Sequence, residues 1–389
     1  MSMKKPKIRF KGYTEDWEQR KLGDICQVIM GQSPDGSTYS EEPSDYILVQ
    51  GNADLKDGWV EPRIWTTQKT KTAQAGDLIM SVRAPAGTMG KTAYDVVLGR
   101  GVAGIKGNEF VYQSLVKMDS DGYWKKMAAG STFESINSDV VKNAEMPIPQ
   151  DIEEQGKNGL CFMTLDHLIT LHQRKCNQAK KLKKYMLQKM FPQNGEKIPE
   201  IRFDGFTDDW EQRKLGEVLK ERSERAIGDE ELLSVTIGNG VIKQVDSDKR
   251  NTASEDKSNY KKVRKGDLPY NSMRMWQGAV GNSEYEGIVS PAYTVLVPTD
   301  ESNSKFFEEL FKKKSTLQIF QRWSQGLTSD TWNLKYPALS TIRFFIPSVE
   351  EQTKIAEYFS SLDQLITLHQ RKCDEMKKIK KFMLQNMFV

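Results

Sequence analysis

Near the end of the chain, one set of positions recurs at helical spacing. From residue 362 to residue 387 these positions lie three or four residues apart, the period of one face of an α-helix. They are Leu362, Ile366, His369, Cys373, Met376, Ile379, Met383 and Met387. Lysines gather between them, and no Gly or Pro interrupts the segment. The pattern predicts one long amphipathic helix.

The same pattern occurs a second time. Residues 165–191 and 362–388 are identical at 20 of 27 positions. Since a helix of this length must bury its stripe against a partner, we expect the two copies to pack together. The intervening chain is long enough to reach either end, and Pro192 and Gly195 allow a reversal, so we favour antiparallel packing. The predicted interface comprises Leu165, Ile169, His172, Cys176, Leu182, Met186, Leu362, Ile366, His369, Cys373, Ile379 and Met383.

A second repeated block divides the chain into two halves. Residues 6–25 and 199–218 are identical at 14 of 20 positions. Between the repeated blocks lie residues 26–150 and 219–349, which we call the variable segments. They share only landmarks, a Gly-Asp-Leu at 76–78 and 266–268 and an Ile-Pro that precedes Glu-Glu-Gln. We predict domains at 1–150 and 195–349, each followed by a long helix, at 151–194 and 350–389.

The variable segments combine strand and helix patterns. Apolar runs at 46–50, 77–82 and 293–298 predict strands, and residues 306–323 predict one helix. Gly156 and Gly159 each weaken a helix by about 1 kcal/mol, so we expect the first long helix to begin near Leu165. The predicted fold is α+β: two globular α/β domains joined by two long helices packed as an antiparallel coiled coil with pseudo-twofold symmetry.

Composition narrows the class of protein. Of 389 residues, 28% are charged and the net charge is +4. No apolar run is long enough to span a membrane, so we expect a soluble, cytoplasmic protein. The cysteines Cys26, Cys161, Cys176 and Cys373 form no CxxC pair, which supports neither a disulfide framework nor a zinc site. His172 and His369 fit a helix interface better than a metal site.

Catalytic motifs are incomplete. Residues 87–92 resemble the end of a phosphate-binding loop, but Pro85 stands where that motif needs glycine. Asp35, Asp54 and Lys56 imitate a metal-dependent nuclease, yet they lie in loops and the other half has no equivalent. No base-methylase motif is present either. A duplicated frame with two dissimilar variable segments is better suited to recognition than to catalysis.

The ordered double occurrence of these elements resembles the specificity subunit of type I restriction-modification enzymes. The resemblance implies a non-catalytic protein whose two target recognition domains read a bipartite, asymmetric site on double-stranded DNA. It further implies that the long helices space the two domains and dock two methyltransferase subunits and, through them, restriction/translocase subunits. S-adenosylmethionine, ATP and Mg are then expected on those partners, with no cofactor or metal on this chain. A self-contained nuclease or methylase, or a coiled-coil adaptor without a DNA role, remains the alternative.

Candidate DNA contacts follow from side-chain chemistry, because Arg and Lys suit guanine or phosphate and hydroxyls suit phosphate. Residues 26–150 carry 12 basic and 15 acidic side chains, and residues 219–349 carry 19 and 17, so we expect weak DNA binding by this chain alone. Trp276 is included, although a core position suits it better. The predicted contacts are Lys69, Lys71, Arg83, Lys91, Arg100, Ser131, Thr132, Lys249, Arg250, Arg274, Trp276, Thr328 and Ser329.

Overall fold

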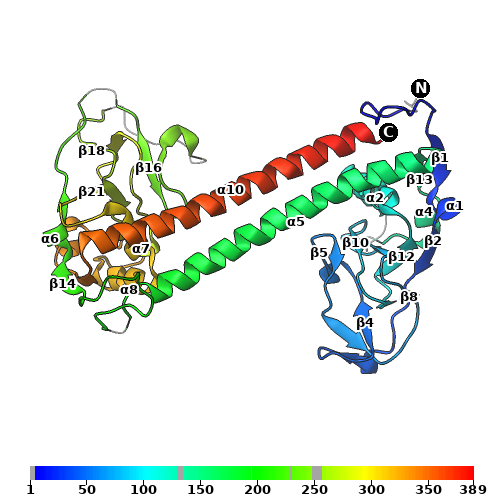
Figure 1. The fold of residues 1–389 in the computed structure, drawn as a ribbon, viewed down its shortest axis with the longest axis horizontal. Helices are drawn as coiled ribbons and strands as arrows, with labels where there is room; N and C mark the ends of the chain where they lie inside the picture. Colours follow the sequence, from blue (N-terminus) through cyan, green and yellow to red (C-terminus); the bar gives the residue numbers. More distant parts are fainter. Residues whose placement is uncertain (1–4, 129–134, 194, 228–229, 248–255) are drawn as a thin grey trace. The chain divides into compact units, whose positions relative to one another are not determined.

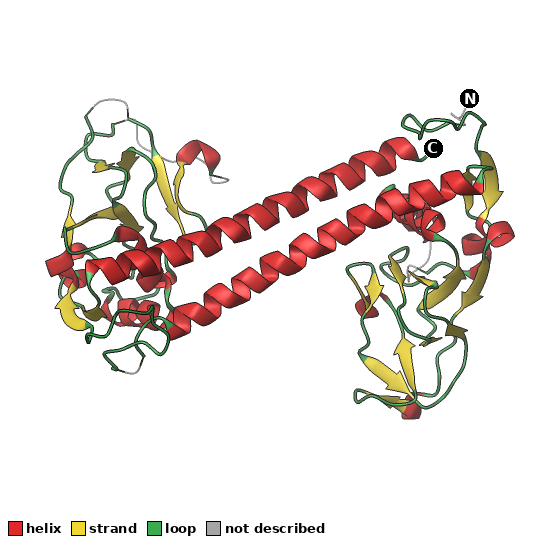
Figure 2. Cartoon of the chain, in the orientation of Figure 1, coloured by secondary structure: helices red, strands yellow, loops and turns green. Residues whose placement is uncertain are grey.

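A computed structural model describes residues 5–128, 135–193, 195–227, 230–247 and 256–389 (Figures 1 and 2). The chain divides into two compact units. Unit 1 comprises Met1–Arg174 and His369–Val389, and unit 2 comprises Lys175–Leu368. The chain passes between the units inside both long helices, so each unit holds part of each helix. Within the described residues, no helix is long and apolar enough to cross a membrane.

The variable segment of unit 1 is built mainly from strands. A six-stranded sheet has the order β2-β12-β9-β10-β6-β5, a five-stranded sheet has the order β3-β7-β4-β11-β8, and β1 pairs with β13. The strands are β1 (Glu18–Lys21), β2 (Gln27–Met30), β3 (Tyr39–Ser40), β4 (Tyr46–Val49), β5 (Leu55–Lys56), β6 (Trp59–Val60), β7 (Ile64–Thr66), β8 (Thr72–Ala73), β9 (Leu78–Ser81), β10 (Met89–Lys91), β11 (Val96–Leu98), β12 (Val102–Lys106) and β13 (Glu145–Ile148). The strands predicted at 46–50 and 77–82 are confirmed as β4 and β9.

Short helices complete this part of unit 1. Asn108 caps the longest of them, its side chain accepting from the amide of Val111, and the first turns of that helix are buried. The helices are α1 (Leu22–Ile25), α2 (Glu109–Ser120), α3 (Tyr123–Ala128) and α4 (Ser138–Lys142), with 3-10 turns η1 (Gly36–Thr38) and η2 (Asn52–Asp54).

Unit 2 has smaller sheets and more helix. Its strands pair as β14-β22, β15-β21-β19, β16-β17 and β18-β20. They are β14 (Glu211–Lys214), β15 (Leu219–Glu221), β16 (Leu233–Thr236), β17 (Gly240–Lys243), β18 (Lys261–Val263), β19 (Leu268–Asn271), β20 (Gly287–Val289), β21 (Tyr293–Pro298) and β22 (Arg343–Ile346). The helices are α6 (Leu215–Val218), α7 (Ser304–Lys312), α8 (Lys314–Trp323) and α9 (Tyr336–Leu339), with 3-10 turns η3 (Gln244–Asp246) and η4 (Met275–Gln277).

One predicted helix of unit 2 is in fact two. The prediction for 306–323 was wrong at Lys313, which is extended with ψ 137° and separates α7 from α8. The break allows Phe307 and Phe311 from α7 and Phe320 from α8 to meet in one core, where Phe311 and Phe320 lie 5.2 Å apart between ring centroids. Packing of these rings therefore outweighs the continuous helical pattern.

The two long helices are α5 (Ile152–Lys189) and α10 (Val349–Met387). The expectation that the first begins near Leu165 was wrong, because α5 runs through both glycines. A Cβ atom on Gly159 would lie 3.0 Å from the Cβ of Glu109 and 3.1 Å from the amide nitrogen of Phe110. Glycine at this position lets α2 approach α5 closely, and the resulting packing offsets the weak helix propensity.

The long helices pack antiparallel within unit 1. Lys380 of α10 pairs with Asp166 of α5, and its Nζ–Oδ1 distance is 2.7 Å. Further along, the Cys373 thiol faces the carbonyl oxygen of Ile169. His172 and His369 then share a hydrogen bond of 3.0 Å between their Nδ1 atoms. Residue numbers rise along α5 as they fall along α10, as predicted.

Unit 2 repeats this packing with the roles of the copies exchanged. Lys183 of α5 pairs with Asp363 of α10 at 2.7 Å, and the Cys176 thiol faces the carbonyl oxygen of Ile366. Lys183 and Asp363 are the repeat counterparts of Lys380 and Asp166, 197 positions away. The Asp of each repeated block thus pairs with the Lys of the other block. This exchange accounts for the occurrence of the same sequence twice.

The buried stripe differs from the predicted one at two positions. Leu182 and Ile379 are each 44% exposed and do not lie in the seam. The neighbouring lysines Lys183 and Lys380 occupy it instead, because each finds an acidic partner on the other helix. Burial lowers the pKa of Lys183, but attraction to Glu309 and Asp363 outweighs this effect and the net pKa is raised.

The remaining predicted interface residues are buried or partly buried in the two units. Cys176, Leu362 and Cys373 are the most enclosed. Leu165 and Met383 pack against the core of unit 1, and Met186 packs against that of unit 2.

The other repeated block fastens each long helix at its start. In unit 1, Arg9 forms two hydrogen bonds of 2.6 and 2.8 Å with Glu154, whose side chain is 1% exposed, and Trp17 donates to the same carboxylate. In unit 2, Arg202 and Glu351 form the same bidentate pair at 2.7 Å. The hydrogen bond to the carboxylate raises the pKa of each arginine.

The last residue of each repeated helix block, 165–191 and 362–388, packs in a hydrophobic core. Phe388, which follows α10, packs in the core of unit 1 with Trp17, Phe110 and Phe162. Its counterpart Phe191 packs in the core of unit 2 against Trp210, Phe306 and Phe359. Each unit therefore holds the start of one long helix and the end of the other.

Candidate nucleic-acid interface

We call the two long helices and the repeated blocks 6–25 and 199–218 the frame. The two ends of each variable segment join the frame at one place. In unit 1, β1 pairs antiparallel with β13, and the amide of Leu22 donates to the carbonyl oxygen of Ala144 at 2.9 Å. In unit 2, β14 pairs with β22, and Leu215 donates to Ile342 at 2.9 Å. We call this strand pair and its backbone hydrogen bond the clamp. Since both ends of a variable segment meet at the clamp, the same frame can carry different segments.

Four of the predicted contacts of unit 1 gather at one end of its strands. Lys71 follows β7 and accepts at its carbonyl from Leu98, the last residue of β11. Arg100 lies two residues further on, and the amide of Val82, beside Arg83, donates to Gly101. Lys69 belongs to the same loop as Lys71, and all four side chains are exposed. The loops thus concentrate positive charge although the variable segment as a whole is acidic.

Lys91 does not belong to this group, and its contact with DNA stays a prediction. Its ammonium pairs with Glu109 at 2.9 Å and is 13% exposed. It also lies over the rings of Tyr112 at 4.5 Å and Trp59 at 5.2 Å. This cation links α2 to β10.

In unit 2, the predicted contacts that are described gather around a hairpin at residues 325–333. Arg274 follows β19 as Arg83 follows β9, and it is exposed. Trp276 is half-buried; its Nε1 donates to the carbonyl oxygen of Met273, and its ring meets that of Trp332 edge-on at 5.2 Å. Thr328 and Ser329 lie exposed in the turn of the hairpin.

The residue that follows the hairpin makes a backbone hydrogen bond that has a counterpart in unit 1. Leu334, just after the hairpin, donates to Ser272 beyond β19, and Ile136 likewise donates to Val82 beyond β9. The predicted contacts Ser131 and Thr132 of unit 1 lie outside the described residues, as do Lys249 and Arg250 of unit 2.

The apolar tip of the hairpin is absent from the contacts predicted from the sequence. Leu327 is fully exposed, and Trp323 and Met273 beside the hairpin are 45% and 42% exposed. A signal was present in the sequence, because Gly130-Ser131-Thr132 and Gly326-Leu327-Thr328 occur at corresponding places with only the middle residue changed.

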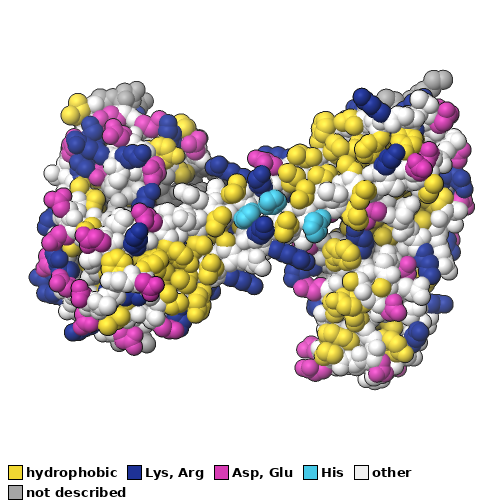
Figure 3. Space-filling view, in the orientation of Figure 1, with side chains coloured by type: hydrophobic (Ala, Val, Ile, Leu, Met, Phe, Trp, Pro, Cys, Tyr) yellow, Lys and Arg dark blue, Asp and Glu magenta, His cyan; other side chains and the backbone are white. Residues whose placement is uncertain are grey.

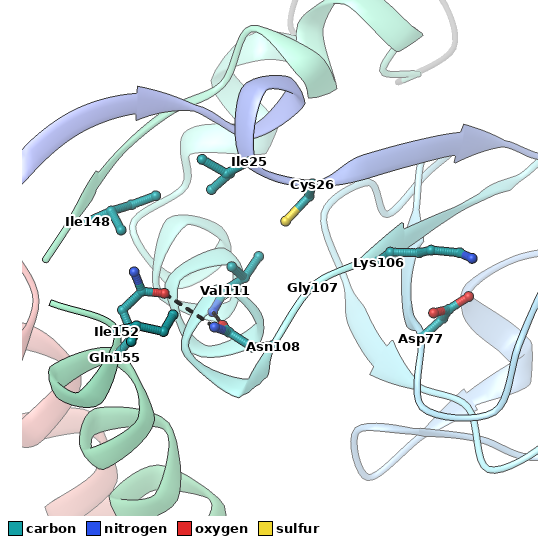
Figure 4. Close-up of a pocket in the computed structure, with 10 residues that line it drawn as sticks. All are labelled: Ile25, Cys26, Asp77, Lys106, Gly107, Asn108, Val111, Ile148, Ile152 and Gln155. Atoms are coloured by element: carbon teal, nitrogen blue, oxygen red, sulfur yellow. Dashed lines mark hydrogen bonds between the residues drawn. The ribbon is translucent and has the colours of Figure 1, made fainter. Parts of the chain in front are cut away.

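A cavity of about 560 Å³ lies in unit 1 where the variable segment meets the start of α5 (Figure 4). Ile25, Cys26, Val111, Ile148 and Ile152 make most of it apolar, and the amides of Asn108 and Gln155 form a hydrogen bond at its rim. Burial raises the pKa of the Cys26 thiol to about 11. This cysteine is therefore a thiol at neutral pH and lacks the reactivity of a thiolate.

The nuclease-like residues are each occupied elsewhere. Asp35 caps the turn at Ser37, Asp54 accepts from the amides of Gln50 and Gly51, and Lys56 pairs with Glu61. Among the described residues, no group of three His, Cys, Asp or Glu side chains is arranged to hold a metal ion.

The outer faces of the long helices carry exposed apolar side chains, on the sides turned away from the seam. Figure 3 shows hydrophobic side chains gathered along the part of α10 in unit 1. These residues are Leu160, Met163, Ile379 and Phe382 in unit 1 and Leu182, Tyr185, Leu365 and Leu368 in unit 2. Repeat counterparts recur in this set, such as Leu182 with Ile379 and Tyr185 with Phe382, so the two units present similar exposed apolar faces.

Comparison with known proteins gives a consistent result. A family model described as type I restriction modification DNA specificity domain matches residues 14–181 and 207–378. A protein of Methanocaldococcus jannaschii assigned as the type I restriction enzyme MjaX specificity subunit is 30% identical over 44% of this chain, and the alignment spans only 42% of that relative. The MjaVIII specificity subunit of the same organism is 22% identical over 94% of this chain and 91% of its own length. The fold matches the S subunit of a type I restriction-modification system from M. genitalium with a TM-score of 0.70 at 14% identity, covering 99% of both chains.

Proposed function

Since this chain belongs to the type I restriction-modification DNA specificity family, we propose that it is the non-catalytic subunit that selects the DNA sequence for such a complex. Each variable segment reads one part of a bipartite site, and because the two segments differ, the site is asymmetric. The observation that carries the proposal is the frame itself: the same clamp and the same Arg–Glu pair hold two different variable segments.

The contact surfaces of the two segments support this assignment. Lys69, Lys71, Arg83 and Arg100 in unit 1, and Arg274, Thr328 and Ser329 in unit 2, combine cations with hydroxyl groups on exposed loops. Such groups bind phosphates and base edges. We propose these residues as DNA contacts, and Trp276 as support for the loop that presents Arg274.

The partners follow from the outer faces of the long helices. We propose that two methyltransferase subunits dock on the apolar residues there, one on each unit, and that the restriction subunits join through them. S-adenosylmethionine, ATP and Mg belong to those partners, and the complex acts in the cytoplasm. The expectation that helix length sets the gap between the half-sites stays a prediction.

The test of the function is co-expression with the cognate methyltransferase in a host that lacks adenine methylation, followed by sequencing of methylated bases. We expect methylation at one two-part motif with a fixed gap of unread base pairs. Methylation without such a motif contradicts the proposal. Metal-dependent cleavage by this chain alone favours the nuclease alternative.

The docking faces are tested separately. Tyr185→Glu or Phe382→Glu places a charge on an exposed apolar site without removing a core contact, so the chain should still fold. We expect each to lose binding of one of two methyltransferase subunits, measured as the mass of the complex by light scattering. Glu375→Lys, on an exposed position of α10, is the control. Full assembly of both variants contradicts the assigned docking faces.

A further inference from the structure

The hairpin at residues 325–333 of unit 2 is closed by hydrogen bonds and presents one fully exposed apolar side chain, Leu327. Its ends are joined by two backbone hydrogen bonds between Gln325 and Asn333, of 3.0 and 2.8 Å. Within the turn, the amide and carbonyl of Thr328 bond the hydroxyl and amide of Thr331. Gly326 has φ +147°, and a Cβ there would lie 2.6 Å from the carbonyl oxygen of Thr331, so only glycine fits.

Hydrogen bonds and ring packing also connect the hairpin to the rest of unit 2. Leu334 donates to Ser272 at 2.9 Å and accepts at its carbonyl from the buried Tyr270 hydroxyl at 3.0 Å. Trp332 packs edge-on against Trp276. These hydrogen bonds and the ring contact do not bury Leu327, whose side chain is fully exposed. Exposed Trp323 and Met273 lie beside the hairpin, so Leu327 is part of an exposed apolar patch, which is typical of a contact made with a partner.

The surroundings favour DNA as that partner. Exposed Arg274 and Arg322 flank the hairpin, and its turn carries Thr328 and Ser329, groups that bind phosphates. The exposed apolar positions that recur in both repeat copies, such as Tyr185 and Phe382, and so suit two like protein partners lie on α5 and α10 instead. Among base edges, the thymine methyl group is the distinctive apolar feature of the major groove.

We propose that Leu327 is a specificity-determining residue that contacts the C5-methyl group of a thymine in the half-site read by unit 2. This inference rests on the proposed function and names one contact within it. It requires that the half-site contain an A·T pair. The middle residue of the Gly-x-Thr sequence, Leu327 here and Ser131 in the other half, then differs because the two half-sites differ.

The test uses the complex with methyltransferase subunits and duplexes in which each thymine of the site is replaced in turn by deoxyuridine, which lacks the methyl. Burying one methyl group is worth about a fourfold change, so one such replacement should lower kcat/KM for methylation about fourfold. Leu327→Ala should lower it about tenfold on the normal duplex and abolish the difference at that one position. Replacements in the other half-site are the internal control for the DNA.

Val245→Ala is the matched protein control, because Val245 is 80% exposed in the same unit and lies outside the hairpin. It should leave both duplexes unaffected. The inference is overturned by a half-site without thymine, by Leu327→Ala with full activity, or by sensitivity to deoxyuridine that persists in Leu327→Ala. Weaker assembly with the methyltransferase in Leu327→Ala, at unchanged DNA affinity, overturns it in favour of a protein contact. In each case a methylated two-part motif shows that the proposed function itself stands.

Discussion

Glu154→Gln should destabilise the start of α5 far more than a substitution that removes an exposed ion pair. The carboxylate of Glu154 is 1% exposed and Arg9 is 13% exposed, and the two form a bidentate pair that Trp17 completes. Removing one partner of a buried pair typically costs about 3–5 kcal/mol. Glutamine keeps one acceptor, and Arg9 retains some access to water, so we expect about 3 kcal/mol.

Hydrogen exchange measures this change where it occurs. Amides of β1, β13 and the first turns of α5 should exchange about 100-fold faster in Glu154→Gln, since 1.4 kcal/mol corresponds to a factor of ten. Glu351→Gln should do the same at β14, β22 and α10. Asp121→Asn, which removes the exposed pair with Lys117, should change exchange by less than about threefold. Equal effects of Glu154→Gln and Asp121→Asn refute the reasoning.

Three further predictions test single features of the frame. Burial lowers the pKa of Lys313 to about 8, so folding disfavours its charged form: the penalty is complete below pH 8 and fades towards pH 10.5. Lys313→Met should therefore raise stability by about 1–3 kcal/mol at pH 7 in urea unfolding and by little at pH 10; destabilisation at pH 7 would show that the contact of Lys313 with Phe191 outweighs burial. Gly156→Ala should stabilise the chain by about 1 kcal/mol, since a Cβ there meets no atom within 4 Å, whereas Gly159→Leu should be destabilising because it separates α2 from α5; thermal unfolding with the opposite order contradicts this. Residues 1–194 alone should form a dimer by light scattering, because the Asp166–Lys380 and Lys183–Asp363 pairs are one contact made twice; a stable monomer contradicts the exchange of roles between the copies.

The sequence predicts the frame well, because two copies of one phrase carry the period of the helices and most of their contacts. Its errors have a common cause. The pattern favours Leu182 over Lys183 as an interface residue. A pattern of apolar positions cannot show that Asp363 of α10 lies where it pairs with Lys183. Gly159 looked like a helix breaker because the close approach of α2 is a tertiary contact.

The candidate DNA contacts could be predicted only in part, for the same reason. Lys91 and Arg83 are equally basic in the sequence, and only the fold places Glu109 and two aromatic rings around one of them. Conversely, Leu327 carries no chemistry that a motif search seeks, and its importance appears only when the hairpin exposes it. The bases that are read depend on such loop conformations.

The most direct test of the account is a chain that carries one variable segment twice. Residues 23–143 are replaced by residues 216–341, which begin and end at the equivalent positions of the clamp. The methylated motif of the complex is then sequenced beside that of the natural chain. We predict that the half-site of unit 1 disappears and that the half-site of unit 2 occurs twice in one motif. Retention of the original asymmetric motif, or a new sequence in both halves, would contradict the claim that each variable segment reads its own half of the site.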